Sequence, residues 1–147
     1  MVKMSRKIEY ALIALKHMLK KDINELTSAK EISNDFNIPF DVISKVLQIL
    51  NQNKILKSEQ GVSGGYKIIS ELKSVSLYDL IRFIEGPVGL VRCLVKDPSE
   101  CEIISNCNII EPLNYLNTKI LNLYKSINLE EILYPKKFQA QLEDISL

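Results

Sequence analysis

Long apolar runs are absent from this chain of 147 residues, and its cysteines are few. No stretch approaches the ~18 consecutive apolar residues that a membrane-spanning helix needs, and residues 1–4 do not open a signal peptide. We therefore expect a cytoplasmic protein. An odd number of cysteines, here three, argues against a structural disulfide framework in a reducing compartment.

Sequence signatures of catalysis are missing as well. No glycine-rich phosphate-binding loop precedes a predicted helix, and no residues are arranged as a nucleophile, base and oxyanion donors. An enzyme or a small electron carrier is therefore disfavoured. The hydrophobic fraction of 46% and the charged fraction of 25% instead indicate an ordinary globular protein with a core of its own.

Positive charge is concentrated in the first half of the chain. Residues 1–70 contain 11 Lys and Arg against 7 Asp and Glu, whereas residues 71–147 contain 8 against 11. A mildly basic front half suits contact with the phosphates of a nucleic acid. A bias of this size also occurs in proteins that never touch DNA, so it needs support from the pattern of the chain.

Hydrophobic periodicity predicts a first helix from Arg6 to about Lys20, capped by Ser5. Ser28 and Glu31 match a capping box, which would start a second helix that ends near Phe36. The buried stripe of the first helix repeats at four-three-four spacing and consists of Ile8, Leu12, Leu15 and Leu19.

An amphipathic third helix is predicted from Phe40 to about Asn53, after a break at residues 37–39. Two helices joined by a three-residue break, the second with a polar outer face, are typical of a helix-turn-helix. A small helical bundle without DNA-binding function is the alternative that this segment alone leaves open. The predicted apolar face of the third helix consists of Ile43, Val46, Leu47 and Leu50.

A β-hairpin is predicted directly after this third helix. Residues 55–58 and 66–69 are the strand candidates, and Gly61, Gly64 and Gly65 between them supply the backbone freedom that a hairpin needs. A hairpin in this position is a wing, whose tip can approach the DNA backbone closely. The predicted fold class is therefore mainly α with a small β wing, a winged helix-turn-helix.

The rest of the chain is predicted to contain a cysteine loop and a long helix. Ser76 and Asp79 match another capping box, so residues 1–85 would form the DNA-binding domain. Residues 86–111 are then a loop that carries all three cysteines, and residues 112–147 are a dimerisation helix and a C-terminal tail. A partner chain is favoured over an intramolecular core because apolar residues repeat at three-four spacing: Leu113, Leu116, Ile120, Leu123 and Ile127.

Four short motifs, taken in order, connect the chain with a known family. From Ser5 to about Leu133 it resembles the winged-helix regulators that include the cluster-assembly repressor IscR, the nitric-oxide sensor NsrR and the cysteine-metabolism repressor CymR. The resemblance implies a repressor that binds a palindromic double-stranded DNA operator as a homodimer. The motifs are Gly64-Gly65-Tyr66, Ile84-Glu85-Gly86-Pro87, Val91-Arg92-Cys93-Leu94 and Asn128-Leu129-Glu130-Glu131-Ile132-Leu133.

The resemblance also implies an iron–sulfur cluster, either 2Fe-2S or 4Fe-4S, held by Cys93, Cys101 and Cys107. By resemblance to the nitric-oxide sensors of the family, the fourth ligand of the cluster would be a carboxylate from the first helix of the other subunit. Glu9 occupies that position here. Operator affinity would then respond to nitric oxide, redox state or iron. Seven residues separate Cys93 from Cys101, where five are more usual.

The residues by themselves leave other roles open for the three cysteines. Thiolates select iron–sulfur clusters, zinc or copper(I), but this spacing lacks the paired Cys-x-x-Cys knuckles of common zinc sites. A cofactor-free regulator that uses a thiol switch or a protein partner is the main alternative. His17 is expected to be a surface or packing residue, because it lies about 12 Å along the first helix from Glu9.

Eight residues are candidates for contact with DNA. Ser44, Lys45 and Gln48 on the third helix should reach base edges, and Gln48 could pair bidentately with adenine. Gln60 and Val62 stand where the family commonly shows arginine and proline, which removes one groove contact. Each candidate could also be an ordinary polar surface residue. Contacts to the DNA backbone are expected from Ser28, Lys30, Ser63, Gly64 and Tyr66.

Overall fold

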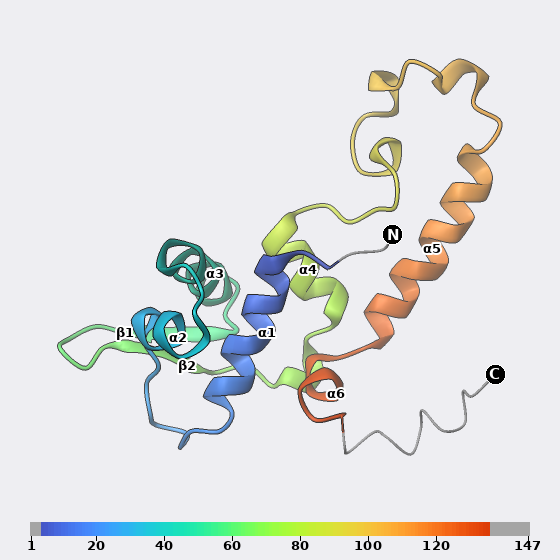
Figure 1. Ribbon diagram of the computed structural model, residues 1–147. Coiled ribbons are helices and arrows are strands. Elements are labelled where there is room, and N and C mark those ends of the chain that lie inside the picture. The colour runs from blue at the N-terminus through green and yellow to red at the C-terminus, as the bar shows by residue number, and fades with distance from the viewer. Residues whose placement is uncertain (1–3, 136–147) are drawn as a thin grey trace.

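A computed structural model describes residues 4–135 of the chain. The segment between α4 and α5 and the N-terminal part of α5 extend away from a body formed by the other helices and a hairpin, whereas α5 also contacts α4 (Figure 1). This architecture confirms the predicted fold class, mainly α with a small β wing. The helices are α1 (Arg6–Met18), α2 (Ala29–Phe36), α3 (Phe40–Gln52), α4 (Leu77–Glu85), α5 (Ile110–Ser126) and α6 (Leu129–Leu133), and the strands are β1 (Leu56–Glu59) and β2 (Gly65–Ile68).

The core lies where α1 and α2 pack against α3. The predicted apolar face of α3 is confirmed, since Ile43, Val46, Leu47 and Leu50 are all at most 1% exposed. The predicted stripe of α1 is only partly right, because Leu12 and Leu19 are half-buried. The buried residues of α1 are Ile8, Ala11, Ala14, Leu15 and Met18. The two alanines have small side chains, which let neighbouring helices approach α1 closely.

Capping residues set the starts of three helices. The boxes at Ser76–Asp79 and Asn128–Glu131 are complete, with a side chain and a backbone N–H bonded in each direction. At α2 only half of the predicted box forms. The Glu31 N–H donates to Ser28 Oγ at 3.1 Å, but the Glu31 carboxylate turns toward donors on and after α1 instead. The prediction of a full box at α2 is therefore wrong.

The wing is fixed to the helix-turn-helix by backbone hydrogen bonds. β1 and β2 pair antiparallel with Leu56 opposite Ile68, one residue away from the predicted bounds. Thr27, just before α2, adds a bridge to Tyr66: each backbone N–H donates to the other residue's carbonyl, at 2.9 and 2.8 Å. The wing therefore cannot move freely with respect to the N-terminus of α2.

Replacing Gly65 with alanine should destabilise this junction. A Cβ at Gly65 would lie 2.7 Å from the carbonyl oxygen of Thr27, so the backbone bridge would have to shift. Overpacking of this kind costs about 1–3 kcal/mol, and we expect Tm to fall by several degrees in circular dichroism melts at equal protein concentration. Ser63→Ala, in the exposed wing tip, is the matched control. An unchanged Tm for Gly65→Ala would contradict the proposed tightness of this contact.

The chain returns to the body after α5. The Leu77 N–H donates to the carbonyl of Ile127 at 2.8 Å, and the Leu129 N–H donates to that of Val75 at 2.9 Å. Leu129 and Leu133 of α6 are buried in the core. These contacts anchor α5 at its C-terminal end. None of the helices within residues 4–135 is long and apolar enough to cross a membrane.

Candidate nucleic-acid interface and metal centre

The outer face of α3 presents two of its three predicted base-contact residues. Lys45 and Gln48 are exposed and lie three residues apart, on the same side of the helix. Ser44 is half-buried, and its Oγ is buried with no hydrogen-bond partner among the described residues. The Ser44 hydroxyl would have to rotate to reach a base edge, so its contact with DNA stays a prediction.

The N-terminus of α2 carries two predicted backbone-contact residues. Lys30 is exposed, whereas Ser28 is half-buried and uses its hydroxyl to cap the helix. Backbone N–H groups at a helix N-terminus and a nearby lysine both attract phosphate. The arrangement is therefore suited to contact with a DNA backbone, and this contact stays a prediction.

The wing candidates differ in what they offer to DNA. Ser63 is exposed at the tip. The Gly64 N–H donates to the carbonyl of Gly61 at 3.0 Å and so closes the turn internally. The Tyr66 backbone is engaged by Thr27, and its half-buried side chain packs against the core. Of these, Ser63 has the most accessible side chain, and phosphate contacts from all three residues stay predictions.

The three cysteines line one cavity at the far end of the molecule from the wing. Cys93, Cys101 and Cys107 are all half-buried and form no disulfide, and they border a cavity of about 520 Å³. The segment that carries them lies between α4 and α5, in the yellow to gold part of Figure 1. Short 3₁₀ turns at residues 92–94, 98–100 and 104–106 give this predicted loop a defined course.

Three thiolates around one cavity form a donor set for a soft metal ion or an iron–sulfur cluster. Tetrahedral Zn–S bonds of about 2.3 Å would bring the sulfurs to within about 4 Å of one another. Within residues 4–135, the cysteines do not form a group whose donor atoms all lie within 4.8 Å. Irons in a cluster lie apart and can be reached by separated thiolates. The donor set is therefore compatible with an iron–sulfur cluster, whereas a tetrahedral zinc site would require the sulfurs to move closer together.

A buried asparagine, not anticipated from the sequence, positions the start of the cysteine loop. Asn117 is 7% exposed, and its Oδ1 accepts a hydrogen bond from the Leu90 N–H at 2.9 Å. The sequence signal that could have identified Asn117 is its position as a polar residue beside the apolar repeat of α5.

Within the loop, Arg92 Nη2 lies 3.3 Å from Glu100 Oε2. A hydrogen bond from the backbone N–H of Ser99 lowers the pKa of Asp97.

The candidate fourth ligand lies apart from the cavity of its own chain. Glu9, on α1, accepts from Arg6 Nη1 at 3.0 Å and is not among the residues that line the cysteine cavity. The start of α1 does meet the end of α4, where the Ser5 hydroxyl donates to Glu85. Because the cysteine loop follows α4 directly and α1 packs on α3, the loop is connected to α3 through α4 and α1.

An apolar side of α5 has no cover within the described chain. Tyr115 is 67% exposed, Leu116 47% and Leu123 55%. None of the five residues of the predicted apolar repeat is fully buried. Three large apolar side chains along one helix are typical of a surface that meets a partner. The exposed apolar side chains of α5 could therefore form the predicted dimer interface, while the dimer itself stays a prediction.

Comparison with known proteins agrees with this arrangement. The chain is 30% identical over 103 residues to the regulator CymR of Bacillus subtilis, covering 69% of this chain and 75% of that one. It is 23% identical over 132 residues to the regulator NsrR of Bacillus licheniformis, covering 90% and 92% of the two chains. Both relatives are named as helix-turn-helix transcriptional regulators.

Solved structures share the fold over nearly the whole chain. CymR, the global cysteine regulator of B. subtilis, superposes with a TM-score of 0.66 at 25% identity, covering 90% of this chain and 97% of that one. IscR of T. potens superposes with a TM-score of 0.64 at 19% identity, covering 92% and 88%. The family of iron-dependent transcriptional regulators called Rrf2 matches residues 4–135. Because the match covers the helix-turn-helix, the wing, the cysteine loop and α5, the chain belongs to the Rrf2 family and is a DNA-binding transcriptional regulator.

Proposed function

We propose that this regulator is a homodimeric repressor whose operator affinity depends on an iron–sulfur cluster. Cys93, Cys101 and Cys107 would hold the cluster together with Glu9 of the partner subunit. The observation that carries this proposal is that all three cysteines of the chain line one cavity. The description of the family as iron-dependent supports it. When bound, such a cluster supplies an iron without a thiolate ligand, which is easier to attack or to lose.

The contacts of the chain suggest how a change in the cysteine loop would reach DNA. The loop is held at its start by Asn117, and α4 just before it contacts α1 through Glu85 and Ser5. α1 packs on α3, which carries Lys45 and Gln48. In a dimer, an operator fixes the separation of the two α3 helices that enter its half-sites at ~34 Å or a multiple of it. A small rotation of each subunit would therefore lower the operator affinity.

Two substitutions on α3 test the proposed DNA face. Gln48→Ala should lose about 1–3 kcal/mol of discrimination at one base pair. Lys45→Ala should instead weaken binding to all duplexes and lower the salt slope, which is the steepness of log affinity plotted against log salt concentration, by about 1. Fluorescence anisotropy over a salt series would measure both, on duplexes selected from a random pool by the wild-type protein.

Lys73→Ala is the matched control for the loss of one positive charge. Lys73 is exposed in the turn beside α6, where it pairs with Glu71 at 3.6 Å. Its removal should leave the salt slope nearly unchanged. If Lys45→Ala and Lys73→Ala altered the affinity equally, the assignment of α3 as the DNA-contacting face would be wrong.

A thiol switch is the second candidate function, and the partial exposure of all three cysteine side chains favours it. Oxidation of an accessible thiol would then alter the loop without any cofactor. This alternative predicts a colourless protein that cannot be reconstituted with iron and sulfide, and whose DNA binding responds to mild oxidants. The two functions are separated by measuring DNA binding during titration with oxidant, before and after attempted reconstitution with iron and sulfide. A thiol switch predicts the same response to oxidant in both samples.

A further inference from the structure

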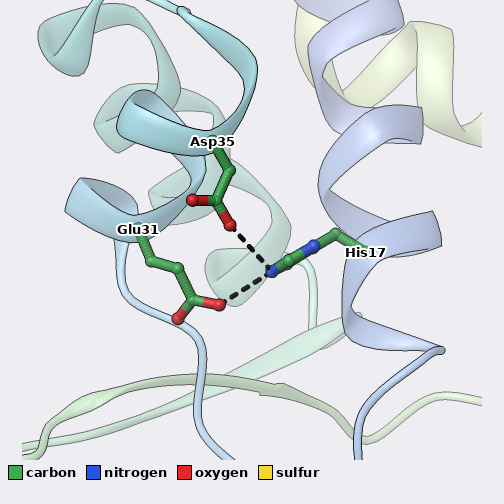
Figure 2. A group of neighbouring side chains, drawn as sticks. All are labelled: His17, Glu31 and Asp35. Atoms are coloured by element: carbon green, nitrogen blue, oxygen red, sulfur yellow. Dashed lines mark hydrogen bonds and ion pairs between the residues drawn. The ribbon is translucent and has the colours of Figure 1, made fainter.

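Three side chains from α1 and α2 converge at a point that the DNA and cluster proposals do not use (Figure 2). His17 lies in the last turn of α1, and Glu31 and Asp35 lie one turn apart on α2. The Nε2 of His17 is 2.8 Å from Glu31 Oε1 and 3.9 Å from Asp35 Oδ2. Within residues 4–135 these residues form the one group of three possible metal ligands whose donor atoms all lie within 4.8 Å of one another.

We propose that His17, Glu31 and Asp35 bind a divalent transition-metal cation. Imidazole nitrogen and carboxylate oxygen bind such ions at about 2.0–2.2 Å, and donors around an ion at that distance lie about 3–4 Å apart. The observed separations are close to this range, so small side-chain movements suffice. The His17 and Asp35 side chains are 18% and 51% exposed, which anchors the site on one side and leaves coordination positions for water on the other.

A lysine takes the place of the cation in the present arrangement. Lys21 Nζ lies 2.5 Å from Glu31 Oε1. Burial raises the pKa of Glu31, but hydrogen bonds from Lys21 and His17 outweigh it, so the pKa is lowered. Lys21 has other acceptors nearby, the Glu25 carboxylate at 3.6 Å and the Leu26 carbonyl at 3.3 Å, to which it can move when a cation binds.

A cation at this point would join α1 to the first helix of the helix-turn-helix. His17 belongs to the helix that packs on α3, whereas Glu31 and Asp35 belong to α2. The bound ion would restrain α2 with respect to the rest of the DNA-binding domain. The site is separate from the cysteines, so it is a second metal input that can be tested whether or not the chain holds a cluster.

Manganese(II) is the first probe, because it prefers oxygen and nitrogen to thiolate ligands and can be used with the full wild-type chain. The electron paramagnetic resonance signal of free Mn²⁺ should fall as it binds, with one ion per chain. Asp35→Asn should weaken binding at least about 10–100-fold, as even loss of an outer-shell partner does. Lys21→Gln should strengthen it several-fold, because it removes a competing positive charge. Asp41→Asn, the same change in charge on α3, should have no effect.

Zinc titration of a full-length variant with all three cysteines replaced by serine is the second measurement, since zinc binds such ligands more tightly than manganese. Asp35 is half-exposed, so Asp35→Asn should fold normally, and circular dichroism verifies this. Equal affinity in the parent and in Asp35→Asn, with either ion, would overturn the site. So would the absence of binding of both ions, or weaker binding in Lys21→Gln.

Discussion

Replacing both Leu116 and Leu123 with glutamate should convert the protein to a monomer and abolish tight operator binding. These side chains are about half-exposed on one side of α5, and a charge there would be buried without a partner in a dimer. A dimer engages two half-sites at once, so its loss should weaken binding by about 10²–10⁴-fold. Analytical ultracentrifugation would give the oligomeric state and fluorescence anisotropy at fixed salt the operator affinity.

Thr118→Glu is the control for this pair. Thr118 is exposed and lies on the opposite side of α5 from Leu116 and Leu123, given 100° per residue. It adds a negative charge to the same helix without entering the proposed interface. A double variant that stays dimeric, or a Thr118→Glu variant that dissociates as readily, would show that the chains associate through another surface.

Replacing Cys93 with alanine should remove the cluster and change the operator affinity together. We expect iron and sulfide to fall to background, because two thiolates from one chain are too few to retain the group. Couplings between a ligand site and a second site are typically 1–3 kcal/mol, so the affinity should change by about 5–150-fold at matched salt. Anaerobic anisotropy titrations of both proteins would measure the change.

Two controls separate coupling from misfolding in that experiment. Wild-type protein stripped of iron should bind the operator as Cys93→Ala does. Ser105→Ala, at an exposed position of the same loop, should keep both the iron and the wild-type affinity. If Cys93→Ala bound the operator as tightly as cluster-loaded wild-type protein, the proposed coupling would be refuted.

Local sequence patterns were sufficient for the elements of this fold. The apolar face of α3 was predicted correctly because its large side chains repeat with helical period and are all buried. Ser76 and Asp79 predicted the start of α4 because a capping box involves residues only three positions apart. The hairpin bounds were displaced by one residue, since glycine spacing limits a turn without fixing its register.

Contacts between residues far apart in the sequence could not be predicted from these local patterns. Glu31 was predicted to complete a capping box, but it meets His17, and their approach depends on how α1 packs beside α2. The buried orientation of the Ser44 hydroxyl depends on its rotamer in the folded protein. Asn117 was not expected to hold Leu90, because 27 residues separate the two positions. Periodicity describes which side of a helix is apolar, and it does not identify the partner of a polar side chain.

The most direct test of the proposed regulation is to purify the full chain without oxygen, and to measure its iron and sulfide content beside its operator affinity. The proposal predicts a brown protein with iron and sulfide in stoichiometric amounts, whose affinity changes about fivefold or more when the iron is removed at constant salt. A colourless protein that also fails to take up iron and sulfide would contradict it. So would a brown protein that binds the operator equally well with and without its iron.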